Sequence, residues 1–310
     1  MAALVPYRLN RALLQRSGPA ARALRYPDPR SAPWRRPALD LHRQKGIGDV
    51  LMCTPALREL KRRNPACHVR FYTRCGDIVR GLPYIDEVLP FDDRPEDAIE
   101  LLYEDLVPPR THIAHIFADI IGVGLTDLRP DCIIDTDLVA AFHAAWAHLP
   151  RPHVIVSRRA SAWTPNKDWP DANWAELLTQ LGQTSGVIEI GAPDPAAIPI
   201  AAPHYIDLRG QTPEPHFIAA IAAADIHAGP MSGPVHVAAA AGKPSVIVLG
   251  GYEDPGNTAY PGNIALATKV PCSPCWLREP CPYDRKCLTA IGPGIVAEAV
   301  RRVWGRDGGS

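Results

Sequence analysis

Residues 228–251 read AGPMSGPVHVAAAAGKPSVIVLGG and predict, in this order, a turn rich in Gly and Pro, an alanine-rich helix and a strand over residues 245–249. Pro234 suits the first turn of that helix, where its missing N–H group costs nothing, and Ser232 is a candidate N-cap. The unpaired N–H groups at a helix start favour an anion, usually a phosphate, and His236 can point towards the same place. The stretch predicts an α/β protein with a candidate phosphate site, although an ordinary structural loop–helix–strand unit explains it equally well.

The composition limits the class of protein. The chain has 310 residues, of which 46% are hydrophobic and 21% charged, which predicts a globular protein of two domains. Its formal net charge of zero argues against a general nucleic-acid binder. No apolar run approaches the roughly 18 residues of a membrane span, and the N-terminus lacks the features of a signal peptide. We therefore expect a cytoplasmic protein whose eight cysteines are reduced or metal-bound.

Residues 1–40 are interpreted as a basic N-terminal extension. Residues 1–36 hold eight arginines against a single acidic residue, Asp28, and several leucines could give part of the segment an apolar helical face. A basic amphipathic arm of this kind can lie on an anionic membrane surface. A disordered extension, or a start codon assigned too early, explains the segment as well. Peripheral contact with the inner face of the cytoplasmic membrane is thus one of three open interpretations.

Strand-like and helix-like segments alternate after the extension, which predicts an α/β fold with parallel sheets. Residues 41–150 form the expected N-terminal domain, and within it residues 97–149 are expected to be mostly helical. A fresh strand over residues 153–157 opens the expected C-terminal domain, residues 151–310, in which the alternation repeats. Ligands of such folds bind at the carboxyl ends of the strands, and a cleft between two such domains is the natural site.

Asp49 is the first candidate for chemistry, because it follows the first strand within the turn Gly46-Ile47-Gly48-Asp49. Glycines at such a turn let a substrate approach the backbone, and Asp49 stands at the carboxyl end of the strand, where ligands of such folds bind. The third glycine of a dinucleotide fingerprint is missing, so nicotinamide binding is poorly supported. Asp49 is interpreted equally well as the N-cap of the following helix.

Two further charged residues lie on loops that follow strands of the second domain. Lys167 can neutralise a phosphate, although a solvated surface lysine is the competing interpretation. Asp194, just beyond Gly191, can bind ribose hydroxyls, as carboxylates past the second strand of such domains commonly do; a solvated loop is again the alternative. The other side chains that could line the site are Trp163, Thr164, Tyr252 and Trp276.

Four cysteines gather near the C-terminus with the spacing Cys-x2-Cys-x5-Cys-x5-Cys, at Cys272, Cys275, Cys281 and Cys287. In a reducing compartment this clustering predicts a metal knuckle that holds tetrahedral Zn or Fe. Its role would be structural, shaping the edge of the cleft, because four thiolates leave no open position for a substrate. A loop of unpaired or oxidised cysteines is the alternative. The other four cysteines lack metal-ligand spacing and are expected to be buried small apolar residues.

Three motifs now stand in order along the chain: GDVL at 48–51 with TPAL at 54–57, KDWP at 167–170 with Trp174, and SGPVH at 232–236 with AAA at 238–240. Together they resemble glycosyltransferase family 9, the bacterial heptosyltransferases that build the inner core of lipopolysaccharide. The similarity extends over roughly residues 41–304. The resemblance implies the GT-B fold, with two Rossmann-like domains facing across a cleft. It implies an acceptor on the N-terminal domain and a nucleotide sugar on the C-terminal one.

The resemblance also implies an inverting transfer of a heptose from ADP-heptose onto a hydroxyl group, without a required divalent metal. Asp49 matches the family's general base. Preorganised donors at a departing diphosphate are typically worth about 3–4 kcal/mol each. The residues assigned to the nucleotide-sugar site in this way are Gly48, Lys167, Ser232, Gly233 and His236, beside Asp194. Many family members carry a similar cysteine stretch, and bacterial protein heptosyltransferases have an iron-binding cysteine finger that resembles it.

One departure from the family pattern leaves the sugar open. Met231 stands where the family commonly has an Asp that contacts sugar hydroxyls, so the donor sugar can differ from the usual heptose. The acceptor is also open, between a lipid-linked saccharide core, a capsule or secondary-metabolite sugar and a protein side chain. A protein that only binds a nucleotide sugar and recruits a partner through its cysteine knuckle is a second hypothesis. A nucleotide-sugar epimerase is a third.

Overall fold

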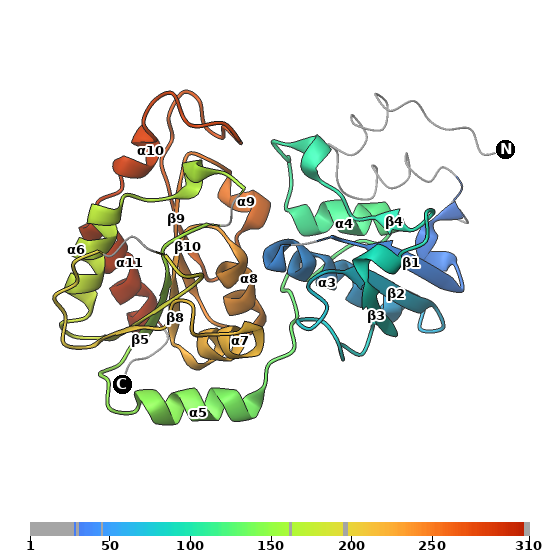
Figure 1. Cartoon of the computed structure of the whole chain (residues 1–310). Coiled ribbons are helices and arrows are strands. Elements are labelled where there is room, and N and C mark those ends of the chain that lie inside the picture. Colours follow the sequence, from blue (N-terminus) through green and yellow to red (C-terminus); the bar gives the residue numbers. More distant parts are fainter. Residues whose placement is uncertain (1–27, 29–30, 45, 161–162, 195–197, 307–310) are drawn as a thin grey trace. The chain divides into compact units, whose positions relative to one another are not determined.

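The computed structural model describes residues 28, 31–44, 46–160, 163–194 and 198–306. The chain forms two compact units, one comprising residues up to Ile133 together with Gly256–Thr258, and the other comprising Ile134–Pro255 and the residues from Ala259 onwards. Each unit contains one parallel sheet (Figure 1), so the predicted α/β fold with two parallel sheets is confirmed. The basic segment formed by residues 1–27, with its predicted membrane contact, lies outside the described residues.

The first unit is built on a four-stranded parallel sheet with the order β3-β2-β1-β4. Apolar side chains of neighbouring strands lie in register, with Leu41 opposite Phe71, and both are fully buried. Helices α3 and α4 pack against each other. The elements are β1 (Ala38–His42), α3 (Ile47–Arg63), β2 (His68–Thr73), β3 (Glu87–Pro90), β4 (Ile99–Glu100) and α4 (Ile113–Ile121).

Helix α3 continues through Pro55, a residue that ordinarily breaks a helix. Pro55 has no N–H group to donate to the carbonyl of Leu51, four residues earlier. The Thr54 hydroxyl donates to that carbonyl instead, at 2.7 Å. The hydroxyl oxygen of Thr54 in turn accepts a hydrogen bond from the backbone N–H of Asp131 at 2.8 Å. One helix, Ile47–Arg63, therefore contains both Asp49 in its first turn and Pro55 in its buried middle.

The second unit is built on a six-stranded parallel sheet with the order β10-β9-β8-β5-β6-β7. The chain runs outward from β5 through β6 to β7 and then returns to β8 on the other side of β5. The strand order thus reverses between β5 and β8, and α/β sheets bind ligands at the carboxyl ends of strands at such a point. The strands are β5 (His153–Ser157), β6 (Gly186–Ile190), β7 (Tyr205–Asp207), β8 (Ile226–Gly229), β9 (Ser245–Gly250) and β10 (Ile264–Ala267).

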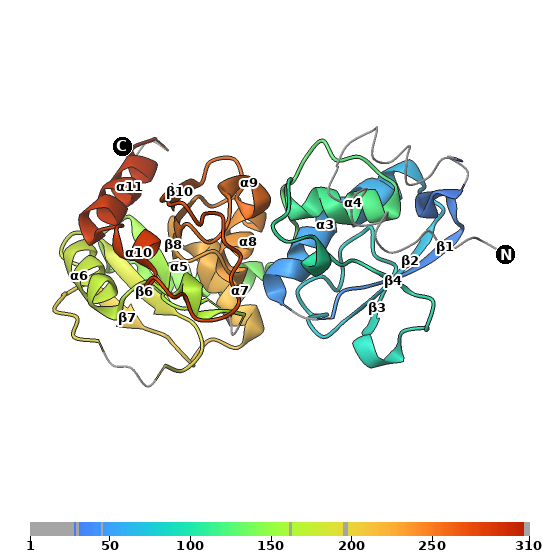
Figure 2. The ribbon, with the colours of Figure 1, turned by 90° about the horizontal axis from the view of Figure 1, so that it is seen from above.

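Helices cover both faces of this sheet. One layer contains α6 and α11, which pack against each other, and the other contains α7 and α8 (Figures 1 and 2). Trp169 and Trp174 anchor the first layer, with ring centroids 4.9 Å apart in an edge-to-face arrangement, a contact worth about 0.5–1.5 kcal/mol beyond the burial of its area. The helices are α5 (Thr136–Trp146), α6 (Asp171–Leu181), α7 (Glu214–Ala223), α8 (Gly233–Ala240) and α11 (Pro293–Arg306).

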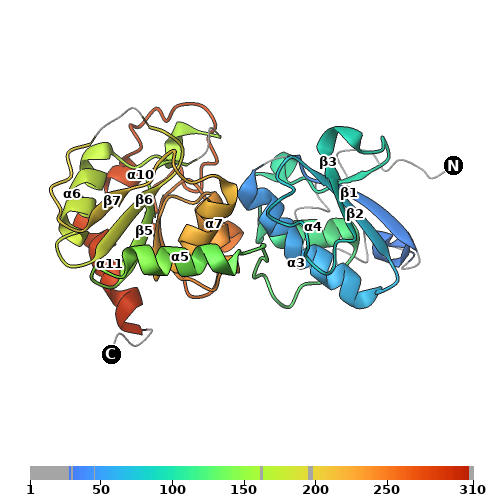
Figure 3. The same cartoon turned by 60° about the horizontal axis from the view of Figure 1, so that its bottom comes forward.

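Two sequence-based expectations need correction. Residues 97–149 are not mostly helical, because they contain β4 and long non-helical stretches beside α4 and α5. The second unit begins at Ile134 rather than at residue 151, because α5 packs along α7 and therefore belongs to it (Figure 3). None of the helices within the described ranges is both long enough and apolar enough to cross a membrane.

Candidate active site

Asp49 lies in the first turn of α3 and is held by two neighbours. Its Oδ2 atom accepts a hydrogen bond from Arg43 Nη2 at 2.9 Å, and its Oδ1 atom accepts one from the Tyr103 hydroxyl at 3.4 Å. The helix begins at Ile47 with Gly46 at the N-cap, so the interpretation of Asp49 as the N-cap is wrong. The side chain is 25% exposed, which leaves the carboxylate accessible to a ligand.

Gly46 makes room for this carboxylate. Its φ of +95° lies in a region that favours glycine. A Cβ atom at this position would stand 2.7 Å from Asp49 Oδ2, closer than packed atoms approach. Gly48, which the family resemblance assigns to the nucleotide-sugar site, is buried within the first turn of α3.

Arg43 joins Asp49 to a second carboxylate that the sequence analysis missed. Its side chain is only 7% exposed. Nη1 donates to Glu104 Oε2 at 2.9 Å, Nη2 forms an ion pair with Glu104 Oε1, and the guanidinium lies 5.2 Å from the ring centroid of Tyr103. Burial would raise the pKa of Glu104, but the hydrogen bond and charge of Arg43 outweigh it and hold that pKa below its ordinary value. The sequence signal that could have found Arg43 is its position directly after β1, because ligands of α/β folds bind at the carboxyl ends of strands.

Lys167 meets the glycine-rich turn at the point where the second sheet reverses its strand order. The loop after β5 ends in a 3-10 helix, Pro165–Lys167, and the turn after β8 leads into α8. Lys167 Nζ donates to the Met231 carbonyl oxygen at 3.4 Å. The structure thus brings together two of the three motifs, which are more than sixty residues apart in the sequence.

The start of α8 has the geometry of an anion site. Ser232 stands at the N-cap with an extended backbone, but its hydroxyl donates to the Pro230 carbonyl at 3.2 Å instead of accepting from the helix. Among the described residues, no side chain caps α8, so the N–H groups at Ser232 and Gly233 are not covered by a capping side chain. A helix start of this kind, next to a lysine, favours a phosphate group.

Among the described residues, three groups lie around the ammonium of Lys167, whose side chain is 16% exposed. Besides the Met231 carbonyl, these are the Glu253 carboxylate, whose Oε1 lies 2.7 Å away, and the ring of Tyr252, with its centroid at 4.8 Å. The Trp163 indole N–H donates to the Tyr252 hydroxyl at 2.7 Å. The ammonium of Lys167 is therefore positioned by these contacts, and the competing interpretation of Lys167 as a solvated surface lysine is wrong.

His236 is buried one turn into α8, with only 3% of the residue exposed. Its Nδ1 atom lies 2.7 Å from the Tyr260 hydroxyl, and the two rings meet edge to face. Burial raises the pKa of Tyr260, so this hydroxyl stays neutral. The contact fixes the orientation of the imidazole in the helix that begins at Gly233.

Asp194 belongs to an ion-pair cluster beyond the carboxyl end of β6. Its Oδ2 accepts from Arg159 Nε at 3.0 Å and lies 3.6 Å from Arg158 Nη2. Arg158, almost wholly buried, also contacts the fully buried Glu189. Because the Asp194 side chain is only 15% exposed and is ion-paired, the interpretation of it as a solvated loop residue is wrong.

The four-cysteine segment, residues 272–287, does not have the predicted metal-binding arrangement. Within the described ranges, which include all four thiols, no group of three or more Cys, His, Asp or Glu side chains is placed to hold a metal ion. Cys272 is exposed and the other three are half-buried. Burial raises the pKa of Cys275, and the nearby thiols of Cys272, Cys287 and Cys281 act in the same direction. The thiols are neighbours, but as placed they do not fit Zn or Fe.

The cysteine segment instead braces the loop that carries Lys167. Asn166 Nδ2 donates to the carbonyls of Leu277 and Glu279, each at 2.7 Å, and its Oδ1 accepts from the backbone N–H of Cys281 at 3.0 Å. Arg285 Nη1 donates to the Asp168 carbonyl at 2.7 Å. These contacts attach the cysteine segment to the loop of Lys167 and give it a structural role.

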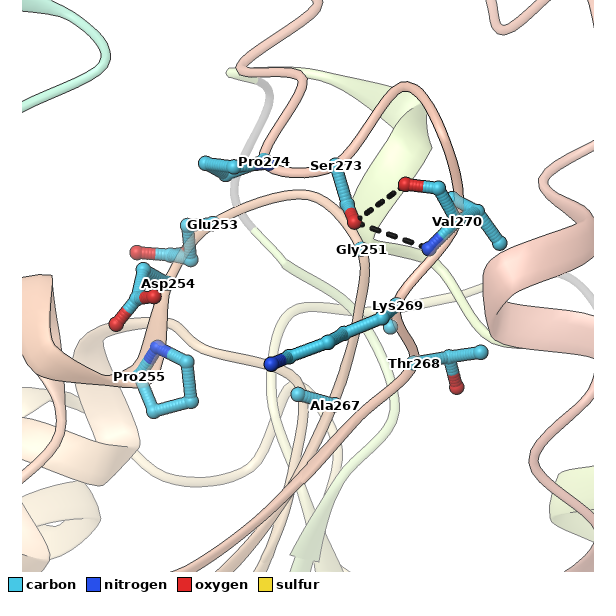
Figure 4. A pocket seen from close by; sticks show the side chains of 11 residues that line it. Gly251, Glu253, Asp254, Pro255, Ala267, Thr268, Lys269, Val270, Ser273 and Pro274 are labelled. Carbon is cyan, nitrogen blue, oxygen red and sulfur yellow. Dashed lines mark hydrogen bonds between the residues drawn. The ribbon is translucent and has the colours of Figure 1, made fainter.

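A pocket of about 250 Å³ is lined by Glu253 and, from the cysteine segment, by Ser273 and Pro274. It lies between the loops that follow β9 and β10, and the side chain of Lys269 extends across it towards Asp254 (Figure 4). Ser273 shapes one wall, because its hydroxyl bonds to both backbone groups of Val270. The sequence analysis did not predict this pocket.

Two parallel α/β units, with a cation and an uncapped helix start at the strand-order reversal of the second, have the architecture of GT-B glycosyltransferases. Residues 110–286, more than half of the chain, match the family model described as glycosyltransferase family 9 (heptosyltransferase). The chain therefore belongs to glycosyltransferase family 9. No curated protein matches it by sequence.

Solved structures share the fold at low sequence identity. A family 9 glycosyltransferase from Veillonella parvula has 15% identity and a TM-score of 0.65, with 86% of this chain and 96% of that chain covered. The ADP-heptose lipopolysaccharide heptosyltransferase II of E. coli has 17% identity and a TM-score of 0.65, covering 87% and 99%. The dodecameric iron-containing heptosyltransferase TibC of enterotoxigenic E. coli, solved in complex with ADP-D-β-D-heptose, has 18% identity and a TM-score of 0.64, covering 87% and 76%.

Proposed function

We propose that this glycosyltransferase inverts the anomeric centre as it moves a heptose from ADP-heptose onto a hydroxyl group of a bacterial surface glycan. The observation that carries the proposal is the contact between Lys167 Nζ and the Met231 carbonyl, 3.4 Å, beside the uncapped start of α8. A cation and a helix N-terminus together suit a diphosphate. The solved complex of TibC with an ADP-heptose supports the choice of donor.

The second unit would bind the donor and hold the leaving group. As the bond between the anomeric carbon and the diphosphate oxygen breaks, negative charge grows on the diphosphate. Lys167, His236 and the backbone N–H groups at Ser232 and Gly233 would stabilise that charge, each contributing about 3–4 kcal/mol in the transition state. Asp194 would bind the ribose hydroxyls with an orientation set by Arg159.

Asp49 would be the general base. It would take the proton of the acceptor hydroxyl while the acceptor oxygen attacks the anomeric carbon from the face opposite the diphosphate. Arg43 and Tyr103 bind its two carboxylate oxygens and so fix its orientation. Gly48, which is buried next to this base, would belong to the nucleotide-sugar site by the family resemblance. No step needs a divalent metal, and the cysteine segment is given no chemical role.

The acceptor is assigned only as a hydroxyl of a surface glycan, with a lipid-linked core saccharide as the first choice. A capsule or secondary-metabolite sugar and a protein side chain are the alternatives. Met231, which cannot accept hydrogen bonds as a carboxylate does, makes the heptose the least supported part of the donor. A nucleotide-sugar-binding protein without turnover is the alternative from another class.

The Asp49→Asn variant tests the proposal. Calorimetry should show that it binds ADP as the wild-type protein does, because Asp49 is placed at the acceptor hydroxyl. Release of ADP from ADP-heptose, assayed with a panel of lipid-linked core saccharides and peptides, should be lost. Transfer by this variant would exclude Asp49 as the base. A wild-type protein that binds ADP-heptose but never releases ADP would favour the binding-protein alternative, and ADP-heptose epimerised without an acceptor would identify an epimerase.

A further inference from the structure

Glu253 places a carboxylate directly against the cation of the proposed diphosphate site. The side chain of Glu253 is 0% exposed, and its Oε1 lies 2.7 Å from Lys167 Nζ. A carboxylate removed from water interacts with its neighbours through a low dielectric, so its charge is poorly screened. Any phosphate that binds Lys167 would therefore feel this negative charge as well.

Both partners of this ion pair are fixed by the cysteine segment. The loop of Glu253 is paired with that segment through the backbone, since Cys275 N donates to the Gly251 carbonyl at 3.2 Å and Trp276 N donates to the Tyr252 carbonyl at 3.0 Å. The loop of Lys167 is held by the three hydrogen bonds of Asn166. These bonds hold the backbones that carry Lys167 and Glu253 beside each other.

We propose that Glu253 weakens the binding of a nucleoside diphosphate at Lys167, and that it weakens the product more than the donor. The inference rests on the proposed assignment of Lys167 to the diphosphate. A free nucleoside diphosphate ends in an unesterified terminal phosphate, which carries more negative charge than the same phosphate carries when it is esterified to the sugar of a nucleotide sugar. Like-charge repulsion therefore acts more strongly on the product, and Glu253 favours its release after transfer.

The competing role for Glu253 is positional, and it predicts the opposite sign. If the carboxylate served only to hold the ammonium in place, its removal would let Lys167 swing away and nucleoside diphosphates would bind more weakly. If the carboxylate repels the phosphate, its removal makes them bind more tightly. The direction of the change in affinity thus separates the two roles.

The experiment compares Glu253→Gln, Glu253→Asp and Asp254→Asn with the wild-type protein, using calorimetry with ADP and with ADP-heptose. Glu253→Gln keeps the side-chain shape and should lower the Kd for ADP about tenfold. The Kd for ADP-heptose should fall less, so that the Kd for ADP divided by the Kd for ADP-heptose becomes smaller. Glu253→Asp keeps the charge but moves it away from Lys167, so the ratio of its Kd for ADP to its Kd for ADP-heptose should lie between those of Glu253→Gln and the wild type. Asp254 is an exposed carboxylate beside Glu253 (Figure 4), and Asp254→Asn should change either Kd less than about twofold because water screens its charge.

The outcomes separate this inference from the proposed function. An unchanged or higher Kd for ADP in a folded Glu253→Gln variant, with wild-type binding intact, would overturn the inference alone. A wild-type protein that binds no ADP in calorimetry would overturn the donor assignment together with it. Thermal unfolding of each variant shows whether it is folded. If Glu253→Gln does not fold, the Glu253→Asp variant decides between the two roles. Because it moves the charge away from Lys167, the Kd for ADP divided by the Kd for ADP-heptose should still be lower than in the wild type. A ratio equal to or higher than that of the wild type overturns the inference.

Discussion

Arg43 Nη2 lies 2.9 Å from Asp49 Oδ2 while the same guanidinium binds both carboxylate oxygens of Glu104. The almost fully buried guanidinium of Arg43 thus pairs with two half-buried carboxylates, Asp49 and Glu104. A guanidinium can do this because its donors form a planar fork. In the mechanism proposed for Asp49, Arg43 is a positioning residue, since it acts on the base and does not contact the reacting atoms.

Arg43→Met should lower both stability and turnover. The change leaves two carboxylates without their buried partner, which costs about 3 kcal/mol of the free energy of unfolding, measured by urea denaturation. The kcat for transfer should fall while the Kd for ADP stays unchanged, because ADP is assigned to the other unit. Arg74→Met is the control, since Arg74 pairs with Asp92 in an exposed ion pair that is worth less than about 1 kcal/mol. Weaker ADP binding by Arg43→Met would contradict this assignment.

Gly46→Ala should reduce kcat beyond what its loss of stability explains. The alanine Cβ would stand 2.7 Å from Asp49 Oδ2 and displace the carboxylate. Gly242→Ala separates this collision from backbone strain, because Gly242 also has a positive φ (+71°) but has open space around it. Both variants should lose about 1–2 kcal/mol of stability. Equal turnover in the two variants would show that the position of Asp49 does not matter.

The sequence predicted strands of the second sheet where a run of apolar residues lies between turn residues. β5 (His153–Ser157) begins and ends as expected, and β9 (Ser245–Gly250) extends one residue beyond its expected end. β8 (Ile226–Gly229) was missed. It carries His227, a polar residue that a local pattern places outside a core. The imidazole is accommodated because the hydroxyls of Ser157 and Ser245 lie 3.0 and 3.3 Å from its two nitrogens, and those residues are distant in the sequence.

Parts of the site were predictable for a similar reason, and parts were not. Lys167 and the turn at Ser232 each carry a local signal, a loop lysine and a helix start. The roles of Arg43, Glu104 and Glu253 depend on contacts with residues of other elements. A local sequence pattern does not show such contacts. The cysteine spacing is a local signal, but metal binding depends on where the four sulfur atoms lie, and in the described part of the chain no three of them are placed to hold a metal ion.

His227 should make the second unit less stable as the pH falls from about 6.5. Burial lowers the pKa of His227 to about 3, below the ordinary value of about 6.5 in an unfolded chain. The unfolded state therefore binds a proton first, and stability falls with pH between these values by up to about 1.4 kcal/mol per unit. The difference in unfolding free energy between wild type and His227→Gln should shrink over this range. A wild-type slope equal to that of His227→Gln would contradict the prediction.

Asn166→Ala should weaken ADP binding without touching the ligand. The side chain makes three hydrogen bonds to the cysteine segment, and its loss leaves two carbonyls and one N–H group without this buried partner. The loop of Lys167 then loses its brace, and we expect the Kd for ADP, measured by calorimetry, to rise about tenfold. Cys272→Ser is the matched control in the same segment. Because the thiol of Cys272 is exposed and the four sulfur atoms do not form a metal site here, this variant should bind ADP within about twofold of the wild type. A large loss of affinity in Cys272→Ser, accompanied by release of bound Zn or Fe, would show that a metal and not Asn166 holds the segment together.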